Sequence, residues 1–234
     1  AARAAVCDRA GAPRVLRGGR QVATTASYQA SALSLRRAGY DPGLADDLLR
    51  RSVAVARSAR DATRPDGAVV GSVGAYGASL ADGSEYTGRY GLDPRTAVAD
   101  LAAFHRPRAQ ALLAAGADEL AFETLPTATE VAAAATLIAE LRCPAWVSVT
   151  PAPGGLTTRD GVPLVDAMAA LAGLPLTGAG VNCCPPADVD PALAQIRRAL
   201  PTVSLVAYPN SGESWDATTQ TWRAQPQSGD HLRD

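Results

Sequence analysis

Short apolar runs alternate with longer segments of helical period along the whole chain. Each run is apolar at nearly every position, which is typical of strands in a parallel sheet that is covered on both faces. Six runs are predicted as strands on this basis: Val22–Tyr28, Ala68–Tyr76, Glu119–Leu125, Ala145–Thr150, Gly178–Cys184 and Ser204–Tyr208.

Helix signals lie between these runs. Asp93-Pro94 predicts the start of a helix that runs to Gly116, and Pro107 is expected to kink or split it. Asp190-Pro191 predicts a helix that ends near Leu200. A further helix is expected after Asp41-Pro42, with one side formed by Leu44, Leu48, Val55 and Ala59.

Thr127 and Glu130 have the spacing of a capping box at the start of another helix, in which hydroxyl and carboxylate satisfy reciprocal backbone amides.

Repeated strand–helix units imply right-handed parallel crossovers, in either a closed barrel or an open doubly wound sheet. Polar and glycine-rich residues follow several strands, which favours the barrel, because its active site is built there. Six strands are two short of a closed eight-stranded barrel.

Composition narrows the class of protein. The chain has 234 residues, 47% hydrophobic and 19% charged, which fits one globular α/β domain. A formal net charge of −1 gives no electrostatic reason to expect nucleic acid or a membrane surface as partner. Four cysteines at irregular spacing do not form a disulfide scaffold, and we expect reduced thiols in the cytoplasm.

Several stretches, in order, resemble the homocysteine S-methyltransferase family, in the branch that uses S-methylmethionine or S-adenosylmethionine as methyl donor. They cover roughly Gln21 to Trp222. The resemblance implies an α/β fold of the (β/α)8 TIM-barrel family, here with about six of eight strands, and a zinc ion held by three cysteine thiolates. The stretches are ATTASYQAS (Ala23 to Ser31), GSVGAYGASLADGSEYTGRY (Gly71 to Tyr90), FHRPR (Phe104 to Arg108), FETLPT (Phe122 to Thr127), GVNC (Gly180 to Cys183) and YPNSGESWDATTQTW (Tyr208 to Trp222).

The resemblance also implies roles for individual residues. Cys183 matches a zinc ligand, although a lone cysteine is otherwise more often a small buried hydrophobe. Cys184 points to the opposite face of its strand and is interpreted as non-ligating. Glu123 matches the glutamate that holds the homocysteine amino group, whereas Asn182 and Tyr76 either contact substrate or only fix their loops.

No catalytic residue is expected beyond the metal site, and His105, a helical histidine beside arginines, is assigned no role. The expected reaction is methyl transfer from a sulfonium donor to the zinc-bound thiolate of L-homocysteine, which gives methionine. Coordination to zinc deprotonates a thiol, and the thiolate is the nucleophile.

Both ends of the chain depart from the family. No match exists here to the family's first strand, with its Asp-Gly-Gly motif, or to its last, whose Gly-Gly-Cys-Cys motif supplies two zinc ligands. Residues 1–20 are interpreted as aberrant, because a one-base shift of the reading frame through Gly11–Arg20 permits a helix sequence typical of the family. The expected organisation is residues 1–20, a partial barrel over residues 21–222, and a tail over residues 223–234.

These departures leave two alternatives to an active methyltransferase: an inactive remnant, or an interaction module completed by another chain. A barrel that lacks its first and last strands would have two open parallel edges. Self-association through these edges is expected, together with small-molecule substrates and no nucleic-acid or membrane partner.

Overall fold

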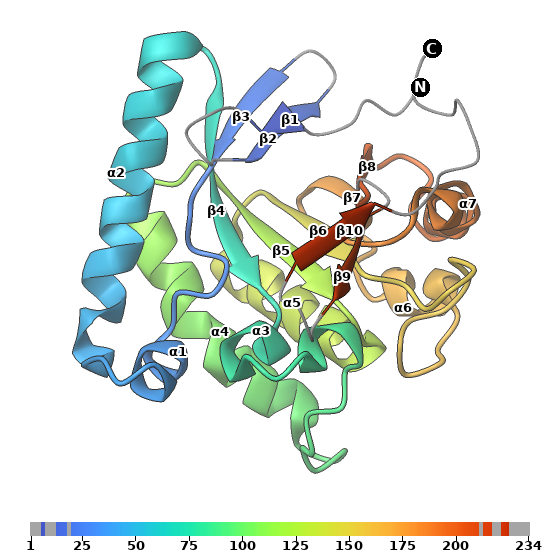
Figure 1. Cartoon of the computed structure of the whole chain (residues 1–234). Coiled ribbons are helices and arrows are strands. Elements are labelled where there is room, and N and C mark those ends of the chain that lie inside the picture. The colour runs from blue at the N-terminus through green and yellow to red at the C-terminus, as the bar shows by residue number, and fades with distance from the viewer. Residues whose placement is uncertain (1–5, 8–12, 18–19, 211–212, 217–220, 225–234) are drawn as a thin grey trace.

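The computed structural model describes residues 6–7, 13–17, 20–210, 213–216 and 221–224. Its main sheet has eight strands in the order β1 to β8, and the six from β3 to β8 pair in parallel (Figure 1). The strands are β1 (Val6–Cys7), β2 (Pro13–Arg17), β3 (Arg20–Thr24), β4 (Ala68–Gly74), β5 (Glu119–Leu125), β6 (Ala145–Val149), β7 (Leu176–Asn182) and β8 (Leu205–Tyr208).

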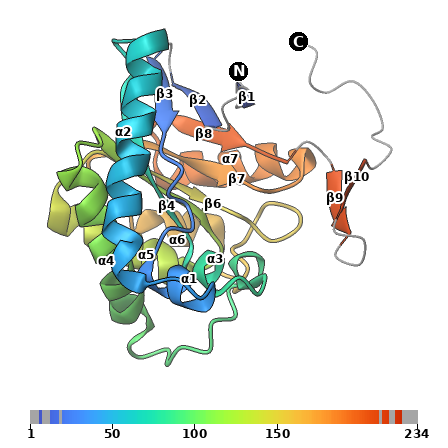
Figure 2. The same ribbon diagram turned by 60° about the vertical axis from the view of Figure 1, so that its left-hand side comes forward.

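Helices cover the outside of this sheet, and the four longest of them each pack on the two strands that they connect (Figure 1 and Figure 2). The prediction of six parallel strands joined by helices, as in an incomplete barrel, is therefore confirmed. A separate two-stranded sheet pairs β9 (Glu213–Asp216) with β10 (Thr221–Ala224). The helices are α1 (Ala32–Arg37), α2 (Ala45–Thr63), α3 (Tyr76–Leu80), α4 (Ala97–Ala114), α5 (Ala128–Leu141), α6 (Leu164–Ala169) and α7 (Val189–Ala199).

The two faces of the sheet are both buried but differ in what they carry. Alternate strand residues point to opposite faces, so Val69 and Val73 lie in the large core beneath the helices. On the other face, a smaller apolar cluster is built around the buried Trp146. The members of this inner cluster are Val22, Ala68, Val70, Ala121, Trp146 and Val206. The apolar strand runs in the sequence reflect burial on both faces.

Helix α2 differs from its prediction in the face that it buries. Leu49 and Val53 are each 1% exposed, whereas Leu48 is 43% and Val55 62% exposed. The predicted face, which included Leu44 and Ala59, was therefore wrong. Both sets of positions have helical spacing, and packing against β3 and β4 selects the neighbouring stripe.

Pro107 does not split α4, which runs from Ala97 to Ala114. Pro107 and Ala103, whose carbonyl loses its helical partner, are both exposed, so that carbonyl lies on the solvent side of the helix. The predicted start at Asp93-Pro94 was wrong, because these residues form a turn before the helix, in which the Asp93 side chain accepts a hydrogen bond from the backbone N–H of Arg95. As predicted, the helix ends near Gly116, whose φ of +96° suits glycine.

The capping box at Thr127 is only half formed. The Thr127 hydroxyl accepts a hydrogen bond from the Glu130 N–H at 3.1 Å, as predicted. The Glu130 carboxylate bonds instead to the backbone N–H of Tyr76 and to two other side chains. The predicted helix at Asp190-Pro191 corresponds to α7, which starts one residue earlier.

The edge of the sheet at β3 is not open. Residues from the segment interpreted as aberrant form β1 and β2, and β2 pairs antiparallel with β3 from Arg14↔Ala23 to Arg17↔Arg20. The expectation of two open edges was therefore wrong at this edge. At the other end, β8 is the last strand of the sheet in the described part of the chain.

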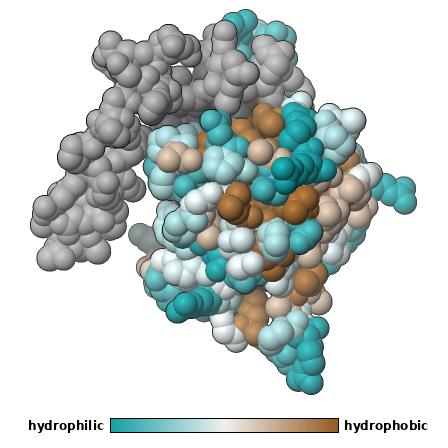
Figure 3. All heavy atoms as spheres, turned by 90° about the vertical axis from the view of Figure 1, so that its right-hand side faces the viewer, coloured by the Kyte–Doolittle hydropathy of each residue, from teal (hydrophilic) through white to brown (hydrophobic). Residues whose placement is uncertain are grey.

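The surface over α6 and α7 mixes hydrophilic and hydrophobic groups (Figure 3). Helix α7 buries Ala192, Leu193 and Ile196 and exposes Arg197 and Arg198. None of the helices in the described part of the chain has both the length and the apolar character needed to cross a membrane.

A pair of adjacent leucines tests the face of α2. We expect Leu49→Ala to lower the free energy of unfolding by about 2–5 kcal/mol, because it leaves a cavity in the core. Leu48→Ala should change it by less than about 1 kcal/mol, since that side chain is partly exposed. Urea unfolding of both variants checks this, and equal losses would contradict the assignment.

Candidate functional site

The carboxyl ends of the parallel strands bring polar side chains from distant parts of the sequence to one edge of the sheet. Glu123 lies near the end of β5, Asn182 ends β7, and Tyr208 ends β8. The pairing places Gly74 beside Glu123 and Asn182 beside Tyr208. This is the edge at which barrel enzymes form their sites.

Glu123 is a buried carboxylate, 8% exposed, with hydrogen bonds to both oxygens. The Ser72 hydroxyl donates to Oε1, and the Tyr208 hydroxyl donates to Oε2 at 2.7 Å. Tyr208 also contacts the Ser148 hydroxyl, at 2.6 Å. Burial raises the pKa of Glu123 above its ordinary value, although both donors act in the opposite direction.

Asn182 joins two strand ends instead of pointing freely into the site. Its Oδ1 accepts a hydrogen bond from the backbone N–H of Thr124 at 3.0 Å, and its Nδ2 donates to the Thr124 hydroxyl at 2.6 Å. The same amide nitrogen lies 3.3 Å from the sulfur of Cys183. Asn182 thus holds Thr124 and Cys183 close together, and its predicted contact with substrate stays a prediction.

Thr124 and Cys183 both have left-handed backbone conformations, with φ of +64° and +51°. Such a conformation is unfavourable for residues other than glycine, and most of all for a β-branched residue such as threonine. Residues of this kind cluster at functional sites, where the surrounding structure compensates for the strain. Here Asn182 supplies the hydrogen bonds that hold Thr124 in place.

The two adjacent cysteines lie in different environments. Cys183 is partly exposed next to Thr124, whereas Cys184 is fully buried in the core beneath the helices. Burial raises the pKa of both thiols, that of Cys184 to about 12. This placement supports Cys183 over Cys184 as the functional thiol.

Two tyrosines that the sequence did not single out also belong to this region. Tyr28 lies within hydrogen-bonding reach of the Thr124 side chain, and charges on Cys183 and Glu123 act on its hydroxyl. Charge on Cys183 likewise acts on Tyr86, which is 46% exposed. The only sequence signal for them was their position within the ATTASYQAS and GSVGAYGASLADGSEYTGRY stretches.

Tyr76 lies in a different cluster. Its ring packs edge-on against Tyr90, with centroids 5.2 Å apart, and against Phe104, with centroids 4.8 Å apart. Its backbone N–H donates to Glu130 at 2.6 Å. The structure therefore does not group the Tyr76 ring with Glu123 and Cys183, and its predicted contact with substrate stays a prediction.

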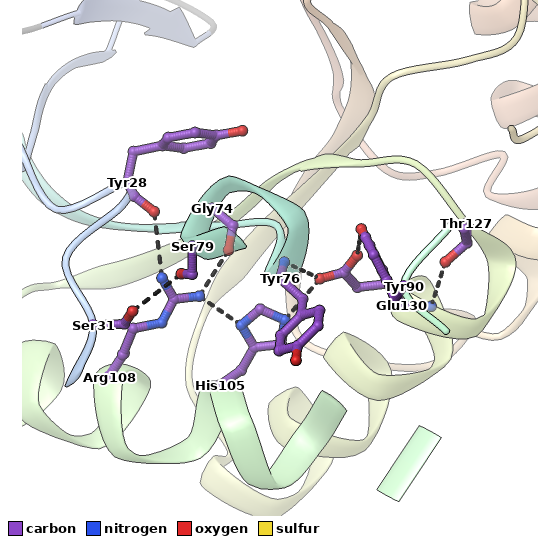
Figure 4. A network of polar contacts seen from close by, with 10 residues as sticks. All are labelled: Tyr28, Ser31, Gly74, Tyr76, Ser79, Tyr90, His105, Arg108, Thr127 and Glu130. Atoms are coloured by element: carbon purple, nitrogen blue, oxygen red, sulfur yellow. Dashed lines mark hydrogen bonds and ion pairs between the residues drawn. The ribbon is translucent and has the colours of Figure 1, made fainter. Parts of the chain in front are cut away.

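His105 on α4 bridges two buried charged side chains, Arg108 on α4 and Glu130 on α5 (Figure 4). Arg108 can only donate, so its contact of 2.6 Å makes Nδ1 of His105 an acceptor. The proton on Nε2 then points to Glu130, 2.9 Å away. Burial and the charge of Arg108 lower the pKa of His105, which favours this neutral form.

Arg108 extends the network toward the strand ends. It donates to the carbonyl of Gly74 at 2.7 Å and to that of Tyr28 at 3.3 Å (Figure 4). Tyr90 donates to the second oxygen of Glu130 at 2.6 Å. Burial lowers the pKa of Arg108 to about 10.

A catalytic zinc site normally has three protein ligands and an open fourth position. Within the described residues, no group of three or more His, Cys, Asp or Glu side chains could hold a metal ion. Cys183 is therefore one candidate ligand, and the described part of the chain does not complete a zinc site.

An open curled β/α half-barrel with a buried carboxylate and a thiol at its carboxyl edge is the frame of a small-molecule enzyme. The family model "Homocysteine S-methyltransferase" matches residues 14–230. The chain belongs to this family.

Known relatives agree with that assignment. The chain is 44% identical over 214 residues to homocysteine S-methyltransferase of Escherichia coli, which covers 88% of this chain and 67% of the relative. It is 38% identical to homocysteine S-methyltransferase YbgG of Bacillus subtilis, covering 66% of that protein. The chain thus spans about two thirds of the length of these relatives.

Solved structures of homocysteine methyltransferase MmuM from Escherichia coli have the same fold. The metallated form superimposes with a TM-score of 0.73 at 43% identity, over 82% of this chain and 67% of that chain. The apo form gives a TM-score of 0.60 at 37% identity, over 79% of this chain and 71% of that chain.

Glu130 and Glu140, both on α5, test how much the buried polar network contributes to stability. Glu130→Ala removes the partner of His105, Tyr90 and the Tyr76 N–H and leaves Arg108 as an uncompensated buried charge. We expect it to cost about 3–5 kcal/mol of unfolding free energy. Glu140→Ala, which breaks only an exposed pair with Arg106, should have little effect on stability. Chemical denaturation measures both, and similar costs would contradict a central role for Glu130.

Proposed function

We propose that the site binds homocysteine and transfers to its sulfur a methyl group from a sulfonium donor. The observation that carries this proposal is the buried Glu123, fixed by Ser72 and Tyr208 and lying close to the partly exposed thiol of Cys183. Family membership supports methyl transfer to homocysteine as the reaction class.

Glu123 is suited to the ammonium group of an amino acid. Its carboxylate is fixed by two hydroxyl donors, and a cation placed beside it would offset the cost of burying the ionised form. Tyr208 and Ser72 set the direction of its lone pairs. In this reading Asn182 keeps Cys183 in place, and Cys183 faces the substrate sulfur.

Acidic groups near the thiol favour a positively charged donor. The charged side chains that act on Cys183 are Glu123 and Glu85. A sulfonium ion is attracted by both, and more strongly in a partly buried site than in water. We favour S-methylmethionine over S-adenosylmethionine, because the GSVGAYGASLADGSEY and YPNSGESWDA stretches most resemble that branch of the family.

The reaction requires that the homocysteine thiol lose its proton, since the thiolate is the nucleophile. The sulfur then forms a bond to the methyl carbon as the bond from that carbon to the sulfonium sulfur breaks. The electron pair of the broken bond stays on the donor, which leaves as a neutral thioether. With S-methylmethionine, both products are methionine.

Zinc would supply the thiolate form of homocysteine when bound, with Cys183 as the described candidate ligand. Because the described residues do not complete such a site, the roles above are argued from the protein side chains alone. Free thiols at this site fit a reducing compartment such as the cytoplasm.

The direct test is methionine formation by the purified chain, supplied with zinc, homocysteine and either S-methylmethionine or S-adenosylmethionine. Methionine formation with a preference for S-methylmethionine, and about one zinc per chain that is lost in Cys183→Ala, would support the proposal and would mean that ligands outside the described residues complete the metal site. A folded chain that binds no zinc and forms no methionine would contradict the proposal and support an inactive remnant. Activity that appears only with a second fragment would support an interaction module.

The raised pKa of Glu123 gives a separate prediction. Only the ionised carboxylate attracts ammonium, so homocysteine affinity should rise as pH increases through a pKa above the ordinary 4.5. Glu123→Gln should abolish this dependence of homocysteine affinity on pH. It should also weaken binding by about tenfold to a hundredfold, as for a lost hydrogen bond to a charged group. Calorimetric titration across pH measures both effects, with Glu140→Gln as the exposed control. If homocysteine affinity still falls at acidic pH in Glu123→Gln, another group is responsible for the titration.

A further inference from the structure

The ring of Tyr28 rests on a glycine that leaves room for it. A Cβ placed on Gly74 would lie 2.4 Å from Cδ2 of Tyr28 and 2.5 Å from its carbonyl oxygen. Both distances are much shorter than a van der Waals contact, so the added atom would clash. No larger residue fits at position 74 unless Tyr28 moves, so the two residues form one packing unit.

The backbone of this unit is held by Arg108. One side chain binds both carbonyls, Gly74 O at 2.7 Å and Tyr28 O at 3.3 Å (Figure 4). Arg108 is itself fixed by His105, and through it by Glu130. The backbone from which the Tyr28 ring projects is thus held by residues of α4 and α5.

The other end of Tyr28 reaches the candidate site. Its hydroxyl lies by the Thr124 side chain, and charges on Cys183 and Glu123 act on it. Burial raises the pKa of the phenol, so it stays neutral and does not act as a base near neutral pH. A neutral aromatic ring beside acidic groups attracts a cation without proton transfer.

The charge of Arg108, next to the Tyr28 backbone, is compensated and therefore does not repel such a cation. Arg108 is positive, but the Glu130 carboxylate lies on the far side of the neutral His105 and compensates it. The arginine therefore fixes Tyr28 with little net positive charge behind the ring. Glu123, by contrast, is already bound by Ser72 and Tyr208 and suits the ammonium group.

We propose that Tyr28 contacts the sulfonium group of the methyl donor and selects it by its charge, and that Arg108 is the positioning residue that aims Tyr28, with Gly74 providing the space. The inference rests on the proposed function for the identity of the donor. It adds a donor-recognising residue and the means by which that residue is placed.

Binding of S-methylmethionine and methionine, each titrated alone into the chain, tests the contact. The two ligands share a skeleton and differ by one methyl group and one positive charge. The wild-type chain should prefer S-methylmethionine, and Tyr28→Leu should reduce that preference about tenfold, the scale of a desolvated cation–π contact. Tyr28→Phe keeps a ring and should retain most of it, as should Tyr40→Phe at a residue that is 64% exposed. A Tyr28→Leu chain that loses affinity for both ligands equally would overturn the proposal.

Positioning by Arg108 predicts coupling between the two residues. Arg108→Lys cannot bind both carbonyls in the same way and should lower the preference, whereas Arg106→Lys, in an exposed pair with Glu140, should not. In Tyr28→Leu, the additional Arg108→Lys change should have little further effect on the preference. Additive losses would mean that Arg108 acts elsewhere. If Arg108→Lys does not fold, Gly74→Ala replaces it, and an unchanged preference in that variant would overturn the positioning role.

The outcomes separate this inference from the proposed reaction. A chain that forms no methionine but prefers S-methylmethionine through Tyr28 would support the inference and contradict the reaction. A wild-type chain without preference for S-methylmethionine over methionine would overturn the inference, whether or not methionine forms.

Discussion

The parallel pairing of β3 to β8 is the constraint on which the rest of the structure depends. It brings the ends of strands that are far apart in sequence to one edge, and the side-chain alternation divides their residues between two faces. On the inner face, an apolar layer around Trp146 lies below a polar layer that includes Ser148 and Glu123. A shift of one residue in any strand would move its polar side chain into the core beneath the helices.

Much of this arrangement could be predicted because it follows from local pattern. The six parallel strands, the end of α4 near Gly116 and the Thr127 cap are all encoded by short runs of residues. The buried face of α2 was not predicted, because leucines occur on two adjacent stripes and only contact with the sheet selects one. The partners of Glu130 were missed for a similar reason, since they come from residues 25 to 54 positions away along the chain.

The candidate site combines residues that sequence could and could not identify. Glu123, Asn182 and Cys183 sit in short stretches that carry the family resemblance, and the structure brings them together. Tyr28 also lies in such a stretch, but nothing in the stretch distinguishes it from its neighbours. Its significance depends on Gly74 and Arg108, which lie 46 and 80 positions later. Tyr76 shows the converse, a residue within a matching stretch whose ring packs among other aromatic residues.

The antiparallel β2 strand has a consequence for barrel closure. It occupies the hydrogen-bonding groups of β3 that a closing parallel strand would need. Any complementing strand must therefore displace β2 before it can pair there, and the two compete for one edge. Closure at β3 would then be a strand exchange that requires the release of β2, whereas no strand in the described part of the chain pairs with the outer edge of β8.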